Sequence, residues 1–221
     1  LMLNVSRCGP GIGGIQPGQA DYYQVTRGGG NGDYRIPVFA PSGIQEAVDM
    51  LHEGMALANE WRNPVMILAD GMIGQMMEPV RLPAYREVSL SGSAIAKNKP
   101  WAITGYGERG GDGQRNVVKS LRLQPEALEK HVEKLFEKYH RAEDALCRYA
   151  ADDLSDAEIV FVAFGTTARI AREAIGILAK EGVRAALIRP ISLWPFPYKA
   201  FDAINYAKTK VVISAELSMG Q

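Results

Sequence analysis

Short apolar runs separated by polar turns mark the first third of the chain. The runs at 1–6, 36–40 and 65–69 have the length of buried strands. After the second run, a Ser42–Gln45 capping box precedes apolar residues at intervals of three and four, which predicts a helix. A strand, a helix and a strand in this order predict a βαβ unit with parallel strands. The apolar positions expected on its helix are Ile44, Ala47, Val48, Leu51, Met55 and Ala58.

The last third of the chain repeats this alternation. Apolar runs at 159–164, 183–188 and 211–215 predict three more strands. A helix that ends at Gly182 should join the first two, and a short helix near Pro197 should precede the third. The prolines of the string RPISLWPFP are expected to exclude any regular element before that short helix. The βαβαβ order is half of a doubly wound parallel sheet. The apolar positions expected on the longer helix are Ile170, Ala174, Ile177 and Leu178.

The middle of the chain differs from both ends. Between residues 82 and 123 the periodicity fades, and we expect an ordered excursion between two lobes with a glycine-rich tip at 102–116. Pro125 then opens a long helix whose apolar residues follow a heptad pattern. We favour packing along the same chain over a coiled-coil partner. The heptad positions are Leu128, Val132, Leu135, Tyr139, Ala142, Leu146 and Tyr149.

The segment from Arg7 to Arg35 contains nine glycines and shows neither helical nor strand periodicity. Connections in compact α/β domains usually take about 2–6 residues, and longer ones are often functional. Arg7 stands directly after a strand, where open α/β sheets bind their ligands. The segment therefore predicts a ligand-binding loop headed by an arginine. The apolar anchors expected to order it are Ile12, Ile15, Tyr22, Tyr23, Val25 and Tyr34.

Composition excludes several classes of function. The 25 basic and 25 acidic residues leave no net charge, which argues against a nucleic-acid surface, and the RGG triplets at Arg27 and Arg109 are too isolated to reverse this. No apolar run is long enough to span a membrane, and no signal peptide is present, so we expect a cytoplasmic protein. Cys8 and Cys147 are too few to hold an iron–sulfur cluster, and Cys8 is interpreted as packed rather than reactive.

Three motifs bear on possible chemistry. The GxGxxG string at 9–14 has no helix after it, as Pro17 follows closely, so a dinucleotide site is disfavoured. The turn 165–167 suits either a bound anion or a structural helix cap, and the cap is favoured. Asp70 offers a carboxylate at the carboxyl edge of the sheet, but without partners at ligand spacing we expect no metal site.

Strings along the whole chain resemble one family. They are NVSRCGPGIGGIQPGQADYYQ, RGGGNGDYR, APSGIQEAVDM, RNPVMILADGMIGQ, VAFGTTARIA and IRPISLWPFP. They are similar to the α subunit of 2-oxoacid:ferredoxin oxidoreductases, especially the branched-chain (2-oxoisovalerate) type. The resemblance implies an α/β fold in three parts: residues 1–80 as the C-terminal half of a pyrimidine-type thiamine-diphosphate domain, 81–154 as the excursion and long helix, and 155–221 as the first part of a transketolase C-terminal-like domain.

The resemblance also implies chemistry. Such enzymes decarboxylate a 2-oxoacid on thiamine diphosphate with Mg, pass electrons through iron–sulfur clusters to ferredoxin, and release an acyl-CoA. Arg7 matches the arginine that contacts the substrate, and Gly11, Ile12 and Gln16 replace the polar residues of 2-oxoglutarate-type relatives, which favours a branched apolar acid. The cofactor's diphosphate and metal ligands are expected on a β subunit, and the clusters on further ferredoxin-like subunits of a hetero-oligomer.

The family's catalytic glutamate precedes this stretch, so the chain is expected to be an inactive fragment with no catalytic residue of its own. Two alternatives stay open from the sequence. One is a transferase of the transketolase type, and the other is an assembly module without catalysis.

Overall fold

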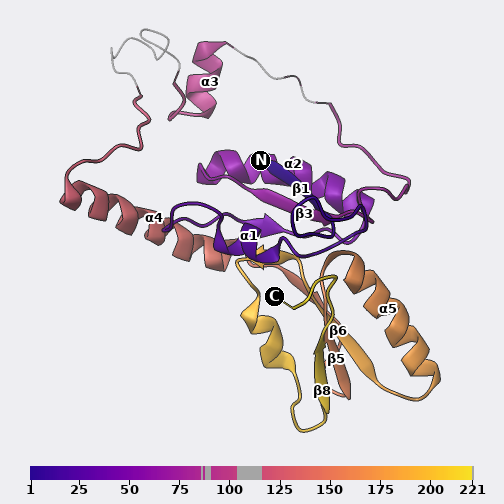
Figure 1. The fold of residues 1–221 in the computed structure, drawn as a ribbon. Helices are drawn as coiled ribbons and strands as arrows, with labels where there is room; N and C mark the ends of the chain where they lie inside the picture. The colour runs from indigo at the N-terminus through magenta and orange to yellow at the C-terminus, as the bar shows by residue number, and fades with distance from the viewer. Residues whose placement is uncertain (86, 88–90, 104–115, 221) are drawn as a thin grey trace. The chain divides into compact units, whose positions relative to one another are not determined.

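The computed structural model describes residues 1–85, 87, 91–103 and 116–220, and it divides into two compact units. The larger unit comprises Leu1–Leu82 and Leu135–Gln221, and the smaller comprises Pro83–Lys134. Within its described residues, the larger unit holds two four-stranded sheets flanked by helices (Figure 1). The predicted α/β fold with parallel strands is therefore confirmed.

The first sheet has the strand order β1-β3-β2-β7. Its first three strands are parallel, and β7 runs antiparallel to β2. The predicted βαβ unit is confirmed, because α2 connects β2 to the parallel strand β3. Helices α1 and α2 lie on opposite sides of this sheet (Figure 1). The bounds are β1 Met2–Ser6, α1 Tyr22–Arg27, β2 Val38–Phe39, α2 Ile44–Trp61, β3 Met66–Asp70 and β7 Ser192–Trp194.

Side chains that point alternately to the two faces of the strands explain why both faces of the first sheet are covered. Phe39 and Ile67 belong to a buried cluster with residues of α2 and with Ala142 of helix α4 (Pro125–Ala145). The neighbouring positions Val38 and Leu68 belong to a second cluster around Val25 of α1. Since successive strand residues point to opposite faces, one short apolar run supplies two cores.

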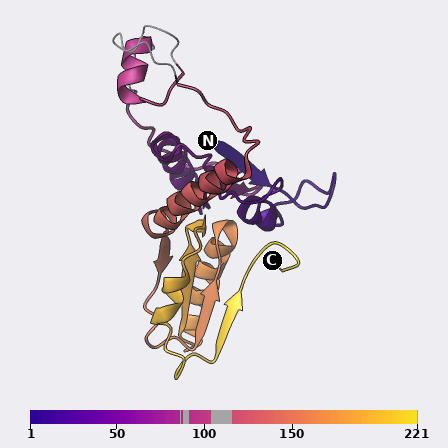
Figure 2. The same ribbon diagram turned by 90° about the vertical axis from the view of Figure 1, so that its left-hand side faces the viewer.

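The second sheet has the order β4-β6-β5-β8, with β6, β5 and β8 parallel and β4 antiparallel to β6. Helix α5 lies on one face and the 3₁₀ helix η1 on the other (Figures 1 and 2). Helices on both faces are the doubly wound arrangement expected from the βαβαβ pattern. The bounds are β4 Tyr149–Ala151, β5 Ile159–Val162, α5 Gly165–Lys180, β6 Ala185–Pro190, η1 Tyr198–Ala203 and β8 Val211–Ser214.

Four short elements were not predicted from the sequence. Strand β7 lies inside the RPISLWPFP string, because its prolines flank the strand instead of interrupting it, and Ala40 N donates to Ile191 O at 2.8 Å. Strand β4 was also not predicted. The Arg7–Arg35 segment, expected to lack a helix, contains α1. Within the smaller unit, helix α3 (Gly92–Asn98) begins after Ser91, whose side chain accepts from Ala94 N at 3.3 Å.

The predicted helix faces are partly wrong. On α2, Met55 is 53% exposed and the buried residues are Met50 and Gly54. On α5, Ile170 and Ile177 are 58% and 57% exposed. The predicted capping box also differs, since Ser42 pairs with Glu46 and not with Gln45. The buried residues of α5 are all small, so its large apolar side chains do not mark the buried side. Helix α2 packs through Met50 and the partly buried Leu51 and Ala58, so its predicted face is right in part.

The long helix begins at Pro125 as predicted, but its heptad pattern ends early. Tyr139, Ala142 and Leu146 are buried, whereas Tyr149 lies in β4 and is 44% exposed. Residues 104–115 of the expected glycine-rich tip, including Arg109, lie outside the described residues. Among the helices that the structure describes, none has both the length and the apolar character needed to cross a membrane.

Candidate functional site

Arg7 follows β1 directly, at the carboxyl end of the first sheet, and the backbone of the following loop surrounds its guanidinium. Nη1 donates to Ile12 O, to Gly14 O at 3.0 Å and to Cys8 O at 3.4 Å. Nη2 donates to Gly11 O at 3.5 Å. Within the described part of the chain, no acceptor pairs with Nε. The edge formed by Nε and Nη2 is therefore the less engaged side of the guanidinium.

The two ends of the loop are held side by side. Arg7 forms an antiparallel bridge with Pro17, and Cys8 N donates to Gln16 O at 2.9 Å. Cys8 is half-buried, and its thiol donates to Pro17 O at 3.0 Å. These contacts close the loop at its base and leave residues 9–16 as its tip.

The expected anchors of the loop divide into two groups. Val25 is buried, and Tyr22 packs against Phe164 with ring centroids 5.9 Å apart. In contrast, Ile12 and Ile15 are 91% and 84% exposed, so the prediction that they anchor the loop is wrong. The loop is ordered by its base and by α1, and its apolar tip faces outward.

A cavity of 680 Å³ lies beside Arg7. Its polar lining combines the Arg7 guanidinium with the Asp21 carboxylate, which accepts from Asn4 Nδ2 at 3.1 Å. Of the four predicted substrate-binding residues, Arg7 and Gly11 line this cavity. Ile12 and Gln16 are exposed on the tip and do not belong to the lining.

Behind the loop, a buried carboxylate joins the two sheets. Asp70 ends β3 and is 2% exposed. Its Oδ2 accepts from Thr166 N at 3.1 Å, and its Oδ1 accepts from Thr166 Oγ1 at 2.8 Å. Oδ1 also accepts from the backbone N–H groups of Met72 and Ile73 at 3.0 and 3.1 Å. The anion at the N-terminus of α5 is thus a side chain of the protein itself.

Gln19 makes a second buried connection between the sheets, and sequence reasoning missed it. Its Nε2 donates to Phe164 O at 2.9 Å, and its Oε1 accepts from Leu217 N at 2.9 Å and from Thr167 Oγ1 at 3.2 Å. Sequence analysis recognised Asp70 and the turn 165–167 separately but did not connect them. The available signal was a carboxylate at the end of one sheet and a helix N-terminus at the end of the other. Gln19 offered none.

An ion pair strengthens the same junction from the side of α2. Nη1 and Nη2 of Arg189 on β6 each donate to the carboxylate of Glu46 at 2.9 Å. Burial raises the pKa of Glu46, but hydrogen bonds from Arg189 and Ser42 outweigh it, so the pKa lies below its ordinary value. We use the name seam for Gln19, Asp70, Thr166 and Thr167 together with the Glu46–Arg189 pair.

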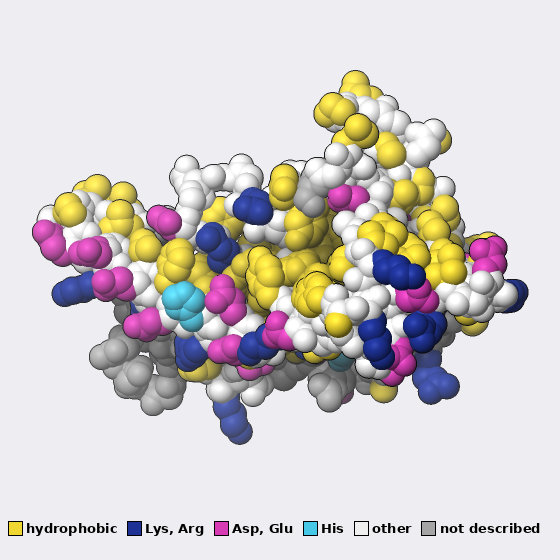
Figure 3. Space-filling model, turned by 90° about the horizontal axis from the view of Figure 1, so that it is seen from below, with side chains coloured by type: hydrophobic (Ala, Val, Ile, Leu, Met, Phe, Trp, Pro, Cys, Tyr) yellow, Lys and Arg dark blue, Asp and Glu magenta, His cyan; other side chains and the backbone are white. Residues whose placement is uncertain are grey.

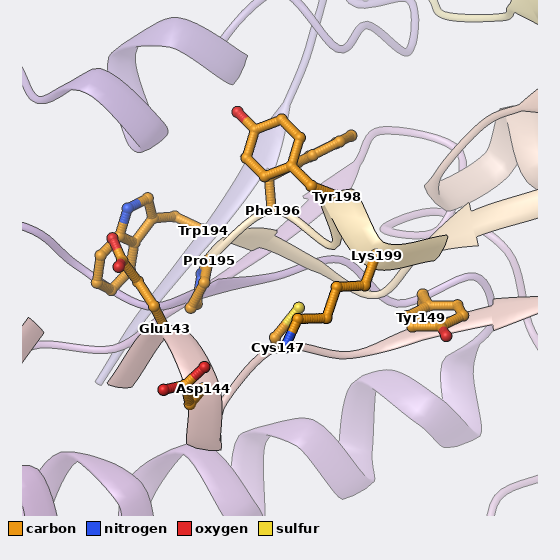
Figure 4. A pocket seen from close by; sticks show the side chains of 9 residues that line it. All are labelled: Glu143, Asp144, Cys147, Tyr149, Trp194, Pro195, Phe196, Tyr198 and Lys199. Atoms are coloured by element: carbon orange, nitrogen blue, oxygen red, sulfur yellow. The ribbon is translucent and has the colours of Figure 1, made fainter. Parts of the chain in front are cut away.

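A second cavity, of 540 Å³, lies away from Arg7 between the end of α4, β4 and the segment 194–199 (Figure 4). Aromatic side chains, among them Trp194 and Phe196, form much of its wall, and Glu143, Asp144 and Lys199 are its charged members. No group of three or more His, Cys, Asp or Glu side chains placed for a metal ion occurs within the described ranges. On the face in Figure 3, the visible basic and acidic side chains are interspersed.

Comparison with known proteins gives matches along the whole chain. The family model described as pyruvate flavodoxin/ferredoxin oxidoreductase, thiamine diphosphate-binding, matches residues 1–150. The model described as pyruvate:ferredoxin oxidoreductase core domain II matches residues 157–221.

Two relatives illustrate the range of sequence identity. The ketoisovalerate oxidoreductase subunit VorB of Methanothermobacter thermautotrophicus is 39% identical over 224 residues, which cover 100% of this chain and 60% of the relative. The 2-oxoglutarate synthase subunit KorA of Methanocaldococcus jannaschii is 30% identical over 237 residues, which cover 100% of this chain and 63% of the relative. The chain thus spans less than two thirds of the length of these relatives.

A solved structure has the same fold. It is the 2-oxoglutarate:ferredoxin oxidoreductase from Magnetococcus marinus with 2-oxoglutarate, coenzyme A and succinyl-CoA bound. It matches with a TM-score of 0.73 at 21% identity, over 99% of this chain and 41% of that chain.

Proposed function

Since the chain belongs to the pyruvate flavodoxin/ferredoxin oxidoreductase family, we propose that it is part of the α subunit of an enzyme that oxidatively decarboxylates a branched-chain 2-oxoacid to an acyl-CoA, with ferredoxin as electron acceptor. The family predicted from the sequence strings is confirmed by the family model. The 39% identity to a ketoisovalerate oxidoreductase subunit, against 30% to a 2-oxoglutarate synthase subunit, supports the branched-chain substrate.

The observation that carries the proposal is the placement of Arg7 at the carboxyl end of β1, in the wall of a 680 Å³ cavity. The loop carbonyls hold Nη1, while the Nε–Nη2 edge has a single contact, at 3.5 Å to Gly11 O. A planar guanidinium edge pairs with a carboxylate through two parallel hydrogen bonds. Arg7 would use this edge to bind and orient the carboxylate of the 2-oxoacid.

Selectivity for the substrate tail is assigned to Gly11, Ile12 and Gln16 on the tip of the loop. Ile12 exposes an apolar side chain that an apolar tail would shield from water, a gain of about 0.8 kcal/mol per buried methylene. The second carboxylate of 2-oxoglutarate would be desolvated against the same side chain without a cationic partner. The tip therefore favours a branched C4 or C5 acid.

The rest of the enzyme is proposed to surround this chain. Residues 1–80 would belong to a pyrimidine-type thiamine-diphosphate domain, 81–154 to a linking excursion and helix, and 155–221 to a transketolase C-terminal-like domain. When bound, thiamine diphosphate supplies the carbanion stabilisation that decarboxylation requires. Its Mg and diphosphate ligands are assigned to a β subunit, the iron–sulfur clusters to further subunits of a cytoplasmic hetero-oligomer, and CoA is the co-substrate.

The proposal is tested by Arg7→Ala in the full-length subunit assembled with its partner chains. The wild-type complex should prefer 2-oxoisovalerate over 2-oxoglutarate by at least about tenfold in kcat/KM. The variant should raise the KM for 2-oxoisovalerate by about tenfold or more, because a charge-assisted hydrogen bond is worth about 1.5–3 kcal/mol. The KM for CoA should change little. Steady-state assays with a viologen acceptor measure all three quantities.

Arg27→Ala is the matched control, because it removes the same charge at the end of α1. Its guanidinium stacks on the Tyr23 ring, 5.1 Å from the centroid, and does not line the cavity. The control should leave both KM values unchanged. An Arg7→Ala complex with wild-type 2-oxoacid kinetics would remove Arg7 from the site, and a wild-type preference for 2-oxoglutarate would reject the branched-chain assignment.

A further inference from the structure

The loop that carries Arg7 rejoins the body of the protein at Gln19, and this glutamine is nearly completely buried. It is 2% exposed, and both ends of its amide are paired. The Nε2 group donates to Phe164 O, between β5 and α5, and the Oε1 atom accepts from Leu217 N, beyond β8. The backbone of Gln19 also bonds to Leu217, since Gln19 N donates to Leu217 O at 2.8 Å. One residue thus connects the loop to the carboxyl ends of two strands of the second sheet.

The position of Gln19 is transmitted to Arg7 through the base of the loop. Pro17, two residues before Gln19, forms the β-bridge with Arg7. The backbone N–H of Cys8 donates to Gln16 O at 2.9 Å, one step further along the same bridge. A displacement of Gln19 therefore moves the strand of backbone against which Arg7 is paired, without any direct contact between the two side chains.

We propose that Gln19 is a positioning residue for the substrate, which fixes the Arg7 guanidinium relative to the second sheet through the base of the loop. This inference rests on the proposed function of Arg7 and adds a residue to it. A glutamine suits the task because its two backbone partners require a donor and an acceptor on one planar group. A methionine has similar length but supplies neither, and a glutamate would set a carboxylate against Phe164 O.

The test is Gln19→Met in the full-length subunit assembled with its partner chains. We expect the KM for 2-oxoisovalerate to rise at least fivefold, while kcat and the KM for CoA stay within about twofold. Loss of folded protein alone would lower the active fraction and kcat, and it would leave KM unchanged. Gln75→Met is the matched control, because Gln75 is exposed and lies outside both the loop and the seam. It should leave every constant unchanged.

Thr167→Val keeps the proposal testable if Gln19→Met does not fold. It removes a hydroxyl that lies 3.2 Å from Gln19 Oε1 and 2.6 Å from Phe164 O. The amide of Gln19 keeps Phe164 O and Leu217 N as its backbone partners. The KM for 2-oxoisovalerate should then rise by about twofold.

Hydrogen exchange supplies a readout that does not depend on turnover. In Gln19→Met, the amide of Cys8 should exchange at least tenfold faster, because the base of the loop opens more often. Unchanged 2-oxoacid KM, or equal changes for the 2-oxoacid and CoA, would overturn the inference. A wild-type complex that oxidises no 2-oxoacid would reject the proposed function instead. Faster exchange at Cys8 in Gln19→Met would in that case still show that Gln19 holds the base of the loop.

Discussion

The tip of the Arg7 loop and the seam behind it are stabilised in opposite ways, although Gln19 of the seam follows the tip directly in the sequence. On the tip, the side chains of Ile12, Ile15 and Gln16 are exposed. The carbonyls of Gly11, Ile12 and Gly14 all accept from one side chain, that of Arg7. In the seam, Gln19 and Asp70 are each 2% exposed, and Thr166 and Thr167 are 6% exposed. Every one of these four side chains is hydrogen-bonded to another element of the fold.

The difference shows where substitutions can be tolerated. A hydrogen bond lost in the solvated tip is replaced by water, so its net cost is small. A bond lost in the seam leaves a buried donor or acceptor unpaired, which costs about 1–3 kcal/mol. Under the proposed function, substrate preference would diverge through the tip, while the buried hydrogen bonds of the seam resist substitution.

The largest expected effect is that of Gly165→Ala, which acts on the seam. Gly165 has φ +60°, and a methyl group there would lie 3.1 Å from Gln19 Nε2 and 3.2 Å from Asp70 Oδ2. The backbone strain costs about 1 kcal/mol, and displacement of two buried hydrogen-bonded groups adds about 1–3 kcal/mol. We expect the free energy of unfolding to fall by about 2–4 kcal/mol in urea titrations of the full-length subunit.

Gly182→Ala separates backbone strain from the seam. Gly182, just after the other end of α5, has φ +79°, and a methyl group there would have no neighbouring atom within 4 Å. The substitution should cost only about 1 kcal/mol. Equal losses in the two variants would mean that the seam adds nothing to stability beyond backbone conformation.

Sequence patterns found the elements whose signals are local. The strands β1, β3, β5 and β8 each fill an apolar run bounded by turn residues, and α4 begins at its predicted proline. The strands β4 and β7 have three residues each and gain their structure from partners far along the chain, so no periodicity could develop.

The candidate site divides in the same manner. Arg7 could be found because it stands at the end of an apolar run. Gln19 could not, because its partners lie 145 and 198 residues away. Asp70 and Thr166 both stood out in the sequence, but they are 96 positions apart. The sequence therefore did not show that the Asp70 carboxylate lies at the helix N-terminus to which Thr166 belongs. Long-range pairing of polar groups has no periodic signature, so only the folded structure reveals it.

A smaller effect is expected at the outer part of the seam, from Glu46→Gln. Side-chain exposure is 29% for Glu46 and 14% for Arg189, so the loss of this pair should cost about 1–2 kcal/mol at pH 7. The pKa of Glu46 is lower in the folded protein than its ordinary value of 4.5. The stabilisation is therefore complete above that value and is lost as the pH falls below it.

The difference between wild type and Glu46→Gln should accordingly shrink from pH 7 to pH 3 in urea titrations. Asp156→Asn is the control, since Asp156 and Lys208 form an ion pair with side chains 57% and 51% exposed. Solvent screens such a pair, so no measurable change in stability is expected there. A difference for Glu46→Gln that is independent of pH would exclude its carboxylate as the cause.

The smallest effect on stability, combined with a change in selectivity, is expected for Ile12→Thr on the tip. Ile12 is 91% exposed, so the free energy of unfolding should stay within about 0.5 kcal/mol of wild type. If its side chain shields the substrate tail, loss of roughly one methylene's contact should cost about 0.8 kcal/mol for 2-oxoisovalerate. The preference for 2-oxoisovalerate over 2-oxoglutarate in kcat/KM should then fall about fourfold.

Ile15→Thr makes the same change three residues away on the tip, at a side chain that is 84% exposed and has no proposed substrate role. It should alter neither stability nor preference. Equal shifts in the two variants would point to a general effect of tip polarity and not to a contact by Ile12. A large loss of stability in either variant would contradict the distinction between tip and seam itself, because an outward-facing side chain would then be supporting the fold.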